Sequence, residues 1–141
     1  MANVIPYAFR GELLTATHNF ASGGDSFKFA LYTASPYSTS STAYSATNEV
    51  SASGTNYTTT GNTLAGNAVA YGTAVASCDF DDTAWTTATF TAAFGAIYND
   101  SQSDKLCVVL DFDGSKSCTN GTFTISIPSP STAADAIISM A

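Results

Sequence analysis

The chain contains one histidine, His18, and this residue limits the catalytic chemistry that the sequence can support. A Ser-His-Asp or Cys-His arrangement needs histidine as its base, and most transition-metal sites use histidine as a ligand. No serine has the flanking glycines of a nucleophile elbow, and His18 lies beside Asn19 in a segment with a helical pattern. We therefore interpret His18 as a surface or packing residue and predict that the protein is not an enzyme.

Carboxylates are densest at Asp79, Asp81 and Asp82. A hard cation such as Ca²⁺ needs several converging oxygen ligands, so this group could contribute to a metal site at a junction between subunits. The spacing is not that of an EF-hand loop, and aspartates commonly begin turns by hydrogen bonding to the backbone. We expect the turn role and predict neither a metal nor another cofactor, with these three aspartates as weak metal candidates.

The three cysteines, Cys78, Cys107 and Cys118, are odd in number and include no CxxC pair. This pattern argues against a disulfide scaffold. We expect three reduced thiols, with Cys107 packed inside the apolar run of residues 106–110. Two alternatives are a Cys107–Cys118 bridge across a hairpin and a bond between subunits.

Aromatic side chains offer a different chemistry, because exposed rings can bind carbohydrate or anchor an interface. The candidates are Trp85 with Tyr32, Tyr37, Tyr44, Tyr57 and Tyr71. Trp85 directly follows the turn that contains Asp81 and Asp82, which is more typical of a core residue at the start of a strand.

The elements that would position these residues begin with a helix. Apolar residues at Phe9, Leu13, Ala16 and Phe20 recur at spacings of three and four, and Pro6 suits a first helical turn. Residues 22–25 are rich in glycine, which favours the end of a helix. The pattern predicts one helix at about residues 6–21.

After residue 25 the apolar period changes to two, which is typical of strands. The predicted strands are 26–33, 42–46, 49–52, 68–80, 85–97, 105–112 and 122–127, with a closing strand or docking segment in 134–141. We expect a bend at Gly72, turns at 81–83 and 113–115, and a polar excursion at 54–66 whose large anchor is Tyr57. The run 105–112 is typical of a strand buried on both faces.

These elements lack a βαβ rhythm, an internal repeat and a linker. They predict one mainly β domain over residues 1–141, an antiparallel β-sandwich or jelly-roll-like barrel with one N-terminal α-helix and strands from about residue 26 onward.

Charge excludes some partners. Eleven acidic and four scattered basic residues give a formal charge of −7, so we expect no binding to nucleic acid or to an anionic membrane surface. The first residues lack the pattern of a signal peptide, and no run is long and apolar enough for a transmembrane helix. We expect a protein that stays in a cytoplasm or is built into a particle assembled there.

Several segments resemble a family of uncharacterised structural proteins of tailed bacteriophages, over roughly residues 26 to 140. The matching segments, in order, are Phe27–Thr33, Thr42–Val50, Phe80–Trp85, Ala96–Asp100, Val109–Gly114 and Phe123–Ile125. The cysteines are not part of this pattern, and the resemblance brings no catalytic residues.

The resemblance implies a virion protein assembled in the bacterial host cytoplasm. Few charges and many small hydroxyl side chains fit this setting, because such a surface loses little solvation when it is buried against a neighbour. We expect a capsid decoration (cement) protein that binds the major capsid protein or another virion protein, as a homo-oligomer, with a trimer favoured. The alternatives are a neck, tail or fibre-associated protein and a receptor- or glycan-binding module.

Overall fold

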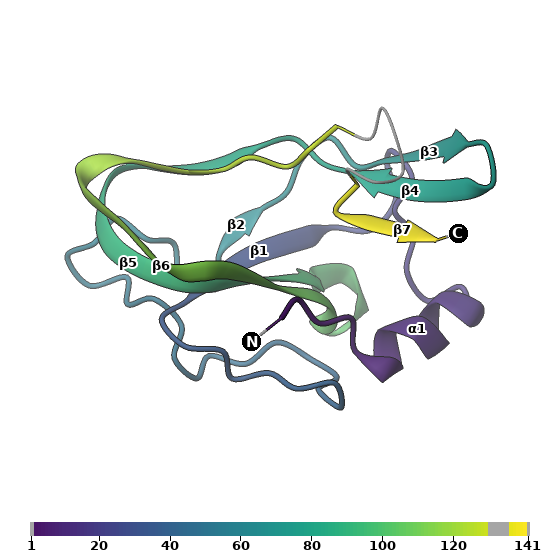
Figure 1. The fold of residues 1–141 in the computed structure, drawn as a ribbon, viewed down its shortest axis with the longest axis horizontal. Coiled ribbons are helices and arrows are strands. Elements are labelled where there is room, and N and C mark those ends of the chain that lie inside the picture. Colours follow the sequence, from purple (N-terminus) through teal and green to yellow (C-terminus); the bar gives the residue numbers. More distant parts are fainter. Residues whose placement is uncertain (1, 130–135, 141) are drawn as a thin grey trace.

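The computed structural model describes residues 2–129 and 136–140, which form a mainly β fold with one N-terminal helix (Figure 1). The elements are α1 (Tyr7–Leu14), β1 (Phe27–Tyr32), β2 (Asn62–Thr63), β3 (Ala68–Gly72), β4 (Val75–Asp79), β5 (Thr83–Asn99), the 3-10 turn η1 (Asp100–Gln102), β6 (Lys105–Ile125) and β7 (Ile138–Met140). One antiparallel sheet has the order β2-β1-β5-β6, and a second has the order β3-β4-β7. The predicted mainly β fold is confirmed, and its two antiparallel sheets are consistent with a sandwich.

The long hairpin of β5 and β6 contributes to both layers of the molecule. In Figure 1 it runs beside β1, bends back at the left and returns above toward β3, β4 and β7. The register of the ladder shifts between Ala92 and Phe94 of β5, where β6 carries extra residues around Asp113 and Gly114. Both of these residues have positive φ, 53° and 98°. The sequence predicted a chain reversal here, but β5 continues alongside, so the same backbone conformations form a bulge that bends the hairpin.

Strand β1 is buried on both faces, because its alternating side chains enter two apolar clusters. Phe27, Phe29 and Leu31 pack in the main core, with Trp85 and Phe123 among their cluster. Ala30 and Tyr32 enter a second cluster, which Tyr37 helps to cover. Strand β6 is shared in the same way, with Cys107 and Val108 in the first cluster and Leu106 and Val109 in the second. The predicted burial of residues 105–112 on both faces is therefore confirmed for the run 106–109.

The N-terminal helix ends at Leu14, seven residues before the predicted end. Ala16 adopts a left-handed conformation with φ 56°. Its N–H donates to the Leu13 carbonyl, and the Thr17 N–H donates to the Glu12 carbonyl. This is a Schellman motif, which terminates a helix. Phe20 still packs on Phe9, with ring centroids 6.1 Å apart, but it arrives there through the turn. The apolar period therefore identified the right contacts and the wrong helix length.

Residues 68–80 form a hairpin, β3 and β4, where the sequence predicted one long strand bent at Gly72. The reversal falls on Thr73 and Ala74, and Ala74 has φ 67°. A left-handed residue in a short connection suits the tight turn of a hairpin. The predicted strands at 26–33 and 85–97 are confirmed as β1 and β5, and the closing strand of the tail is β7. Residues 134, 135 and 141 of that predicted tail lie outside the described residues.

The predicted strands 42–46 and 49–52 are loops whose ladder pairing with the sheet is limited to isolated bridges, Ala43 to Lys105 and Glu49 to Tyr32. Serine hydroxyls accept hydrogen bonds from nearby backbone N–H groups in this region, as at Ser45 and Ser51. Such local bonds compete with strand pairing. In the excursion at 54–66, the short strand β2 pairs with β1 and Leu64 is buried beside Tyr57, so Tyr57 is not its only large anchor.

Candidate functional site

A buried polar network joins the segment after α1 to the turn between β5 and β6. His18, whose side chain has no exposed surface, lies with Nε2 2.8 Å from Oε2 of Glu12. Nδ1 of His18 lies 2.9 Å from Nδ2 of Asn99. The same Asn99 amide donates to Asp25 at 2.8 Å, and Lys105 donates to Glu12 at 2.6 Å. We call these five residues the His18 network.

The hydrogen bonds of this network fix the tautomer of His18. The Asn99 side-chain oxygen accepts from the Ser101 N–H, so the amide NH₂ group must face His18 and Asp25. Because this NH₂ group can only donate, Nδ1 of His18 accepts. The proton is then on Nε2, which donates to Glu12. Both ring nitrogens are occupied by protein partners, so the imidazole has no free position for a substrate.

The two carboxylates of the network are held in their charged form. Burial would raise the pKa of Glu12, but hydrogen bonds from Lys105 and His18 outweigh it and hold this pKa below its ordinary value. Burial likewise opposes ionisation of Asp25, and hydrogen bonds from the Asn19 backbone N–H and from Asn99 lower its pKa. The network therefore holds the N-terminal segment against the ends of β5 and β6. Its geometry does not indicate a bound ligand.

The packing role predicted for His18 agrees with its burial, but its predicted place in a helix is wrong. The Schellman turn carries His18 out of α1 and toward Asn99, 81 residues away in the chain. Its partner Asn99, the last residue of β5, was not among the residues that the sequence predicted for a site. A buried asparagine gives no periodic signal, and only the contact between distant segments identifies it.

The weak metal candidates do not converge on a site. Oδ1 of Asp79 accepts from the Phe80 N–H, and Asp82 accepts from the Ile127 N–H and the Ser126 hydroxyl. Asp81 lies against the backbone of Gly66. Within residues 2–129 and 136–140, no group of three or more His, Cys, Asp or Glu side chains is arranged to hold a metal ion. Asp79 and Asp82 therefore accept hydrogen bonds from backbone N–H groups, as aspartates at turns commonly do.

The three cysteines are free, and the bridge considered between Cys107 and Cys118 is not formed. Both residues belong to one strand, β6, and lie on opposite sides of the bulge at Asp113 and Gly114. Burial raises the pKa of Cys78 to about 12 and that of Cys107 well above its ordinary value. Neither thiol therefore supplies a thiolate nucleophile near neutral pH.

Trp85 is a core residue and cannot offer its ring to a ligand. It is 3% exposed and stacks on Tyr57 with ring centroids 5.6 Å apart. Its indole N–H has no hydrogen-bond partner among the described residues. Tyr32 and Tyr37 are also buried, and their hydroxyls bond to each other at 2.6 Å. Of the predicted aromatic candidates, Tyr71 on β3 is the strongly exposed one, at 84%.

A second polar cluster holds the long loop between β1 and β2 onto the sheet. Glu49 accepts from the Tyr44 hydroxyl at 2.6 Å and from the Tyr57 hydroxyl at 2.8 Å. The Tyr57 hydroxyl also accepts from the Leu31 N–H of β1. We call Tyr44, Glu49 and Tyr57 the Glu49 cluster. Burial and the Glu49 carboxylate raise the pKa of both tyrosines.

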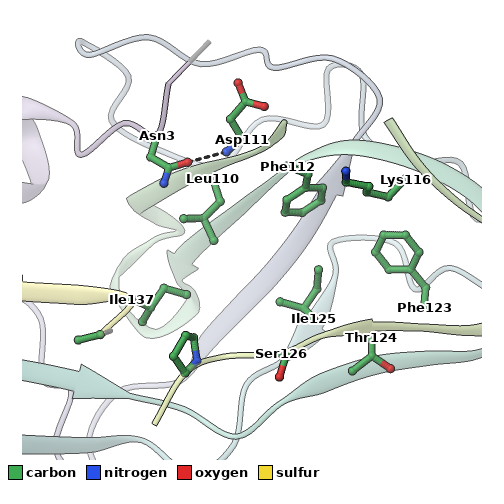
Figure 2. Close-up of a pocket in the computed structure, with 12 residues that line it drawn as sticks. Asn3, Leu110, Asp111, Phe112, Lys116, Phe123, Thr124, Ile125, Ser126 and Ile137 are labelled. Atoms are coloured by element: carbon green, nitrogen blue, oxygen red, sulfur yellow. Dashed lines mark hydrogen bonds between the residues drawn. The ribbon is translucent and has the colours of Figure 1, made fainter. Parts of the chain in front are cut away.

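An open cleft of about 570 Å³ lies on the concave side of the bent hairpin (Figure 2). Apolar side chains from both halves of β6 line it, among them Leu110, Phe112, Phe123 and Ile125. Ile137 closes one side, and the Asn3 side chain accepts from the Asp111 N–H at its rim. The cleft borders the chain on both sides of residues 130–135, which the structure does not describe, so we assign it no ligand.

Exposed apolar side chains gather at the opposite end of the molecule from the bend. The six large hydrophobic side chains exposed in the described residues are Ile5, Tyr7, Leu14, Val69, Tyr71 and Met140. They belong to the N-terminal segment with α1 and to β3 and β7, and Figure 1 shows α1 beneath β7. A groove of about 370 Å³ joins Ile5 and Leu14 to Met140, and a second hollow joins Met140 to Val69. We call the surface formed by Ile5, Leu14, Val69 and Met140 the apolar end.

No helix in the described part of the chain is both long enough and apolar enough to span a membrane. No protein-family model, no curated protein and no solved structure matches this chain. The apolar end is therefore the candidate functional surface on its own geometry, because grouped exposed hydrophobics mark interaction sites more often than scattered ones.

Proposed function

We propose that this protein is a structural component of a tailed-bacteriophage virion and that it acts by binding neighbouring proteins, without catalysis. The phage setting rests on the resemblance over residues 26–140. The mode of action is supported by one observation, the gathering of four of the six exposed large hydrophobic side chains, Ile5, Leu14, Val69 and Met140, at the apolar end. A monomer with no partner would scatter such side chains over its surface.

Within the virion, we favour a capsid decoration protein that binds the major capsid protein, as a trimer. The surface supports contact with protein more than with nucleic acid, because the chain carries a formal charge of −7 and its four basic residues are dispersed. The His18 network and the Glu49 cluster anchor both the N-terminal segment and the long loop. This anchoring suits a protein that has to persist on the outside of a particle.

Addition of the purified protein to bare phage heads tests this function. We expect binding that saturates at a fixed number of copies per head and that falls when Leu14 or Met140 is replaced by serine. The exposed Ser40→Ala variant is a control that should bind as the wild type does. Quantitative mass spectrometry of complete particles should give hundreds of copies.

Two outcomes would overturn the assignment. A particle with about twelve copies or fewer would place the protein in the neck or tail, which have low rotational symmetry. Failure to bind heads, together with absence from purified particles, would remove the virion role altogether. A glycan-binding role is not proposed, because Trp85 and three of the five tyrosines on which that hypothesis depended, Tyr32, Tyr37 and Tyr57, are buried.

A further inference from the structure

The groove in the apolar end runs along an open strand edge. Strand β7 pairs with β4 on one side only, and it is the last strand of the sheet order β3-β4-β7. Ile138, Ser139 and Met140, three successive residues of β7, all line the groove. Successive side chains of a strand point to opposite faces, so a hollow lined by all three follows the edge of the strand.

The opposite wall of the groove is apolar and comes from α1 and from Ile5, two residues before the helix. Ile5, Leu13 and Leu14 line this wall, and Leu14 is 85% exposed. Backbone N–H and C=O groups alternate between the two sides of a strand, so part of the β7 backbone faces the groove. No backbone hydrogen bond joins β7 to α1 or to another described segment beyond β4. The groove therefore combines unpaired backbone groups with an apolar wall.

One positive charge lies at this groove in an otherwise acidic chain. Arg10 is the charged residue among those that line it, and the formal charge of the whole chain is −7. Its guanidinium lies 4.8 Å from the centre of the Tyr7 ring and forms no ion pair with the described residues. A carboxylate on the occupant would complement Arg10 and make a charge-assisted hydrogen bond.

We propose that an extended segment of a partner protein adds to the open edge of β7 as a further strand, between β7 and α1. Its backbone pairs with β7, its alternate apolar side chains contact Ile5 and Leu14, and an acidic residue pairs with Arg10. This is recognition by strand addition, in which backbone bonds supply affinity and side-chain pockets supply specificity. The inference rests on the proposed function only in that both require a protein partner.

The other edge strand, β3, is a weaker choice for such a partner. Its exposed Tyr71 lines neither hollow, and Val69 lines the second hollow instead of the groove beside α1. A second copy of the chain is the alternative occupant for β7. It is disfavoured because two copies would bring together surfaces that each carry Arg10 and belong to chains of the same net charge.

Synthetic peptides test the proposal without any phage particle. The first probe is a fluorescein-labelled peptide of about ten residues with valine alternating with threonine and one central aspartate. We expect it to bind the full-length protein, and the same peptide with lysine in place of aspartate to bind about tenfold more weakly. A peptide with proline at the centre should not bind, because proline lacks the N–H that a strand ladder needs.

Protein variants locate the binding. Leu14→Ser should weaken binding of every peptide, and it should leave the fold intact because Leu14 is 85% exposed. Arg10→Gln should remove the preference for aspartate over lysine. Tyr71→Ser, the matched control on the β3 edge, should bind as the wild type does. Sedimentation of the wild-type protein at the same concentrations should show no self-association through this groove.

Several results would overturn the proposal. Equal binding of the proline peptide would exclude strand addition, and equal loss in Tyr71→Ser and Leu14→Ser would indicate non-specific apolar binding. An oligomer that dissociates in Leu14→Ser would identify a second copy as the occupant. Peptide binding without binding to heads would contradict the proposed function alone, whereas binding to heads without peptide binding would contradict this inference alone.

Discussion

The His18 network and the Glu49 cluster perform the same task with opposite electrostatics. Each fastens a segment that is not a strand onto the sheet through buried or half-buried carboxylates. In the His18 network the carboxylates Glu12 and Asp25 receive charged or amide donors, and their pKa values are lowered. In the Glu49 cluster the donors are tyrosine hydroxyls, whose own pKa values are raised. One attachment is therefore sensitive to acid and the other to alkali.

The largest effect is expected from Asn99→Leu. This change removes the amide that donates to both His18 and Asp25. Nδ1 of the buried His18 loses its donor, whereas Asp25 keeps the Asn19 N–H. We expect a loss of about 3 kcal/mol in the free energy of unfolding, measured by urea denaturation. Gln102→Ala is the matched control, because Gln102 also donates to Asp25 but through a longer hydrogen bond of 3.5 Å. A loss equal to that of the control would show that the network contributes little net stability.

A smaller loss is expected from Glu49→Gln in the other cluster. The amide keeps one acceptor oxygen, so one tyrosine hydroxyl loses its acceptor, and we expect a loss of about 1.5 kcal/mol. Tyr57→Phe should cost a similar amount, since it also removes the acceptor of the Leu31 N–H. The double variant should lose less than the sum of the two single variants. Strict additivity would contradict the bond between Glu49 and Tyr57.

The response to acid should separate the two attachments. The folded-state pKa values of Glu12 and Asp25 lie below the ordinary values of these groups, 4.5 and 3.8. Their contribution is therefore complete above those values and is lost as the pH falls through the lower folded-state pKa. Urea midpoints measured down to about pH 3 should fall for the wild type and for Tyr57→Phe. The fall should be shallower in Asn99→Leu, and an equal fall there would be the contrary result.

At alkaline pH, stability should depend on pH in the opposite direction. The folded-state pKa values of Tyr44 and Tyr57 lie above the ordinary tyrosine value of 10.0. Protonated tyrosines therefore stabilise the fold fully below that value, and this contribution is lost as the pH rises through the higher folded-state pKa. Urea midpoints above pH 10 should fall less steeply in Tyr57→Phe than in Asn99→Leu. Equal slopes in the two variants would argue against a role for the Tyr57 hydroxyl.

The smallest effect concerns the turn that presents His18. Ala16 has φ 56°, a conformation that glycine adopts without steric strain. Ala16→Gly should raise the free energy of unfolding by about 0.5 to 1 kcal/mol. Ala21→Gly is a control in the same segment that should not stabilise the protein. A loss of stability in Ala16→Gly would mean that the left-handed turn is not retained in solution.

Strand periodicity predicted most of the sheet, because alternating burial places an apolar residue at every second position, as at Phe27, Phe29 and Leu31. Positive-φ positions were harder to interpret. Asp113-Gly114 suits either a hairpin turn or a bulge, and only the presence of β5 alongside decides between them. The helix was overestimated because Phe20 returns to Phe9 by a turn that has the same apparent spacing.

The polar clusters were out of reach of sequence patterns. The partners of Asn99 lie on segments distant in sequence. Those of Glu49 are five and eight residues away, but they lie in a loop that has no periodic pattern to indicate the contact. The apolar end was likewise not predicted from sequence patterns. Leu13 and Leu14 are neighbours in one helical run, yet one packs against the core and the other is exposed.

The bent hairpin of β5 and β6 has a consequence for how the chain folds. Its two strands are joined by a short turn at residues 100–104, so the largest ladder of the protein closes between segments that are close in sequence. Contacts of low sequence separation form quickly, whereas β1 must find β5 across more than sixty residues. We expect the hairpin to provide the folding nucleus and β1 to dock afterwards, followed by β7. The last strand to join the sheet would then also be the one whose open edge is available to a partner.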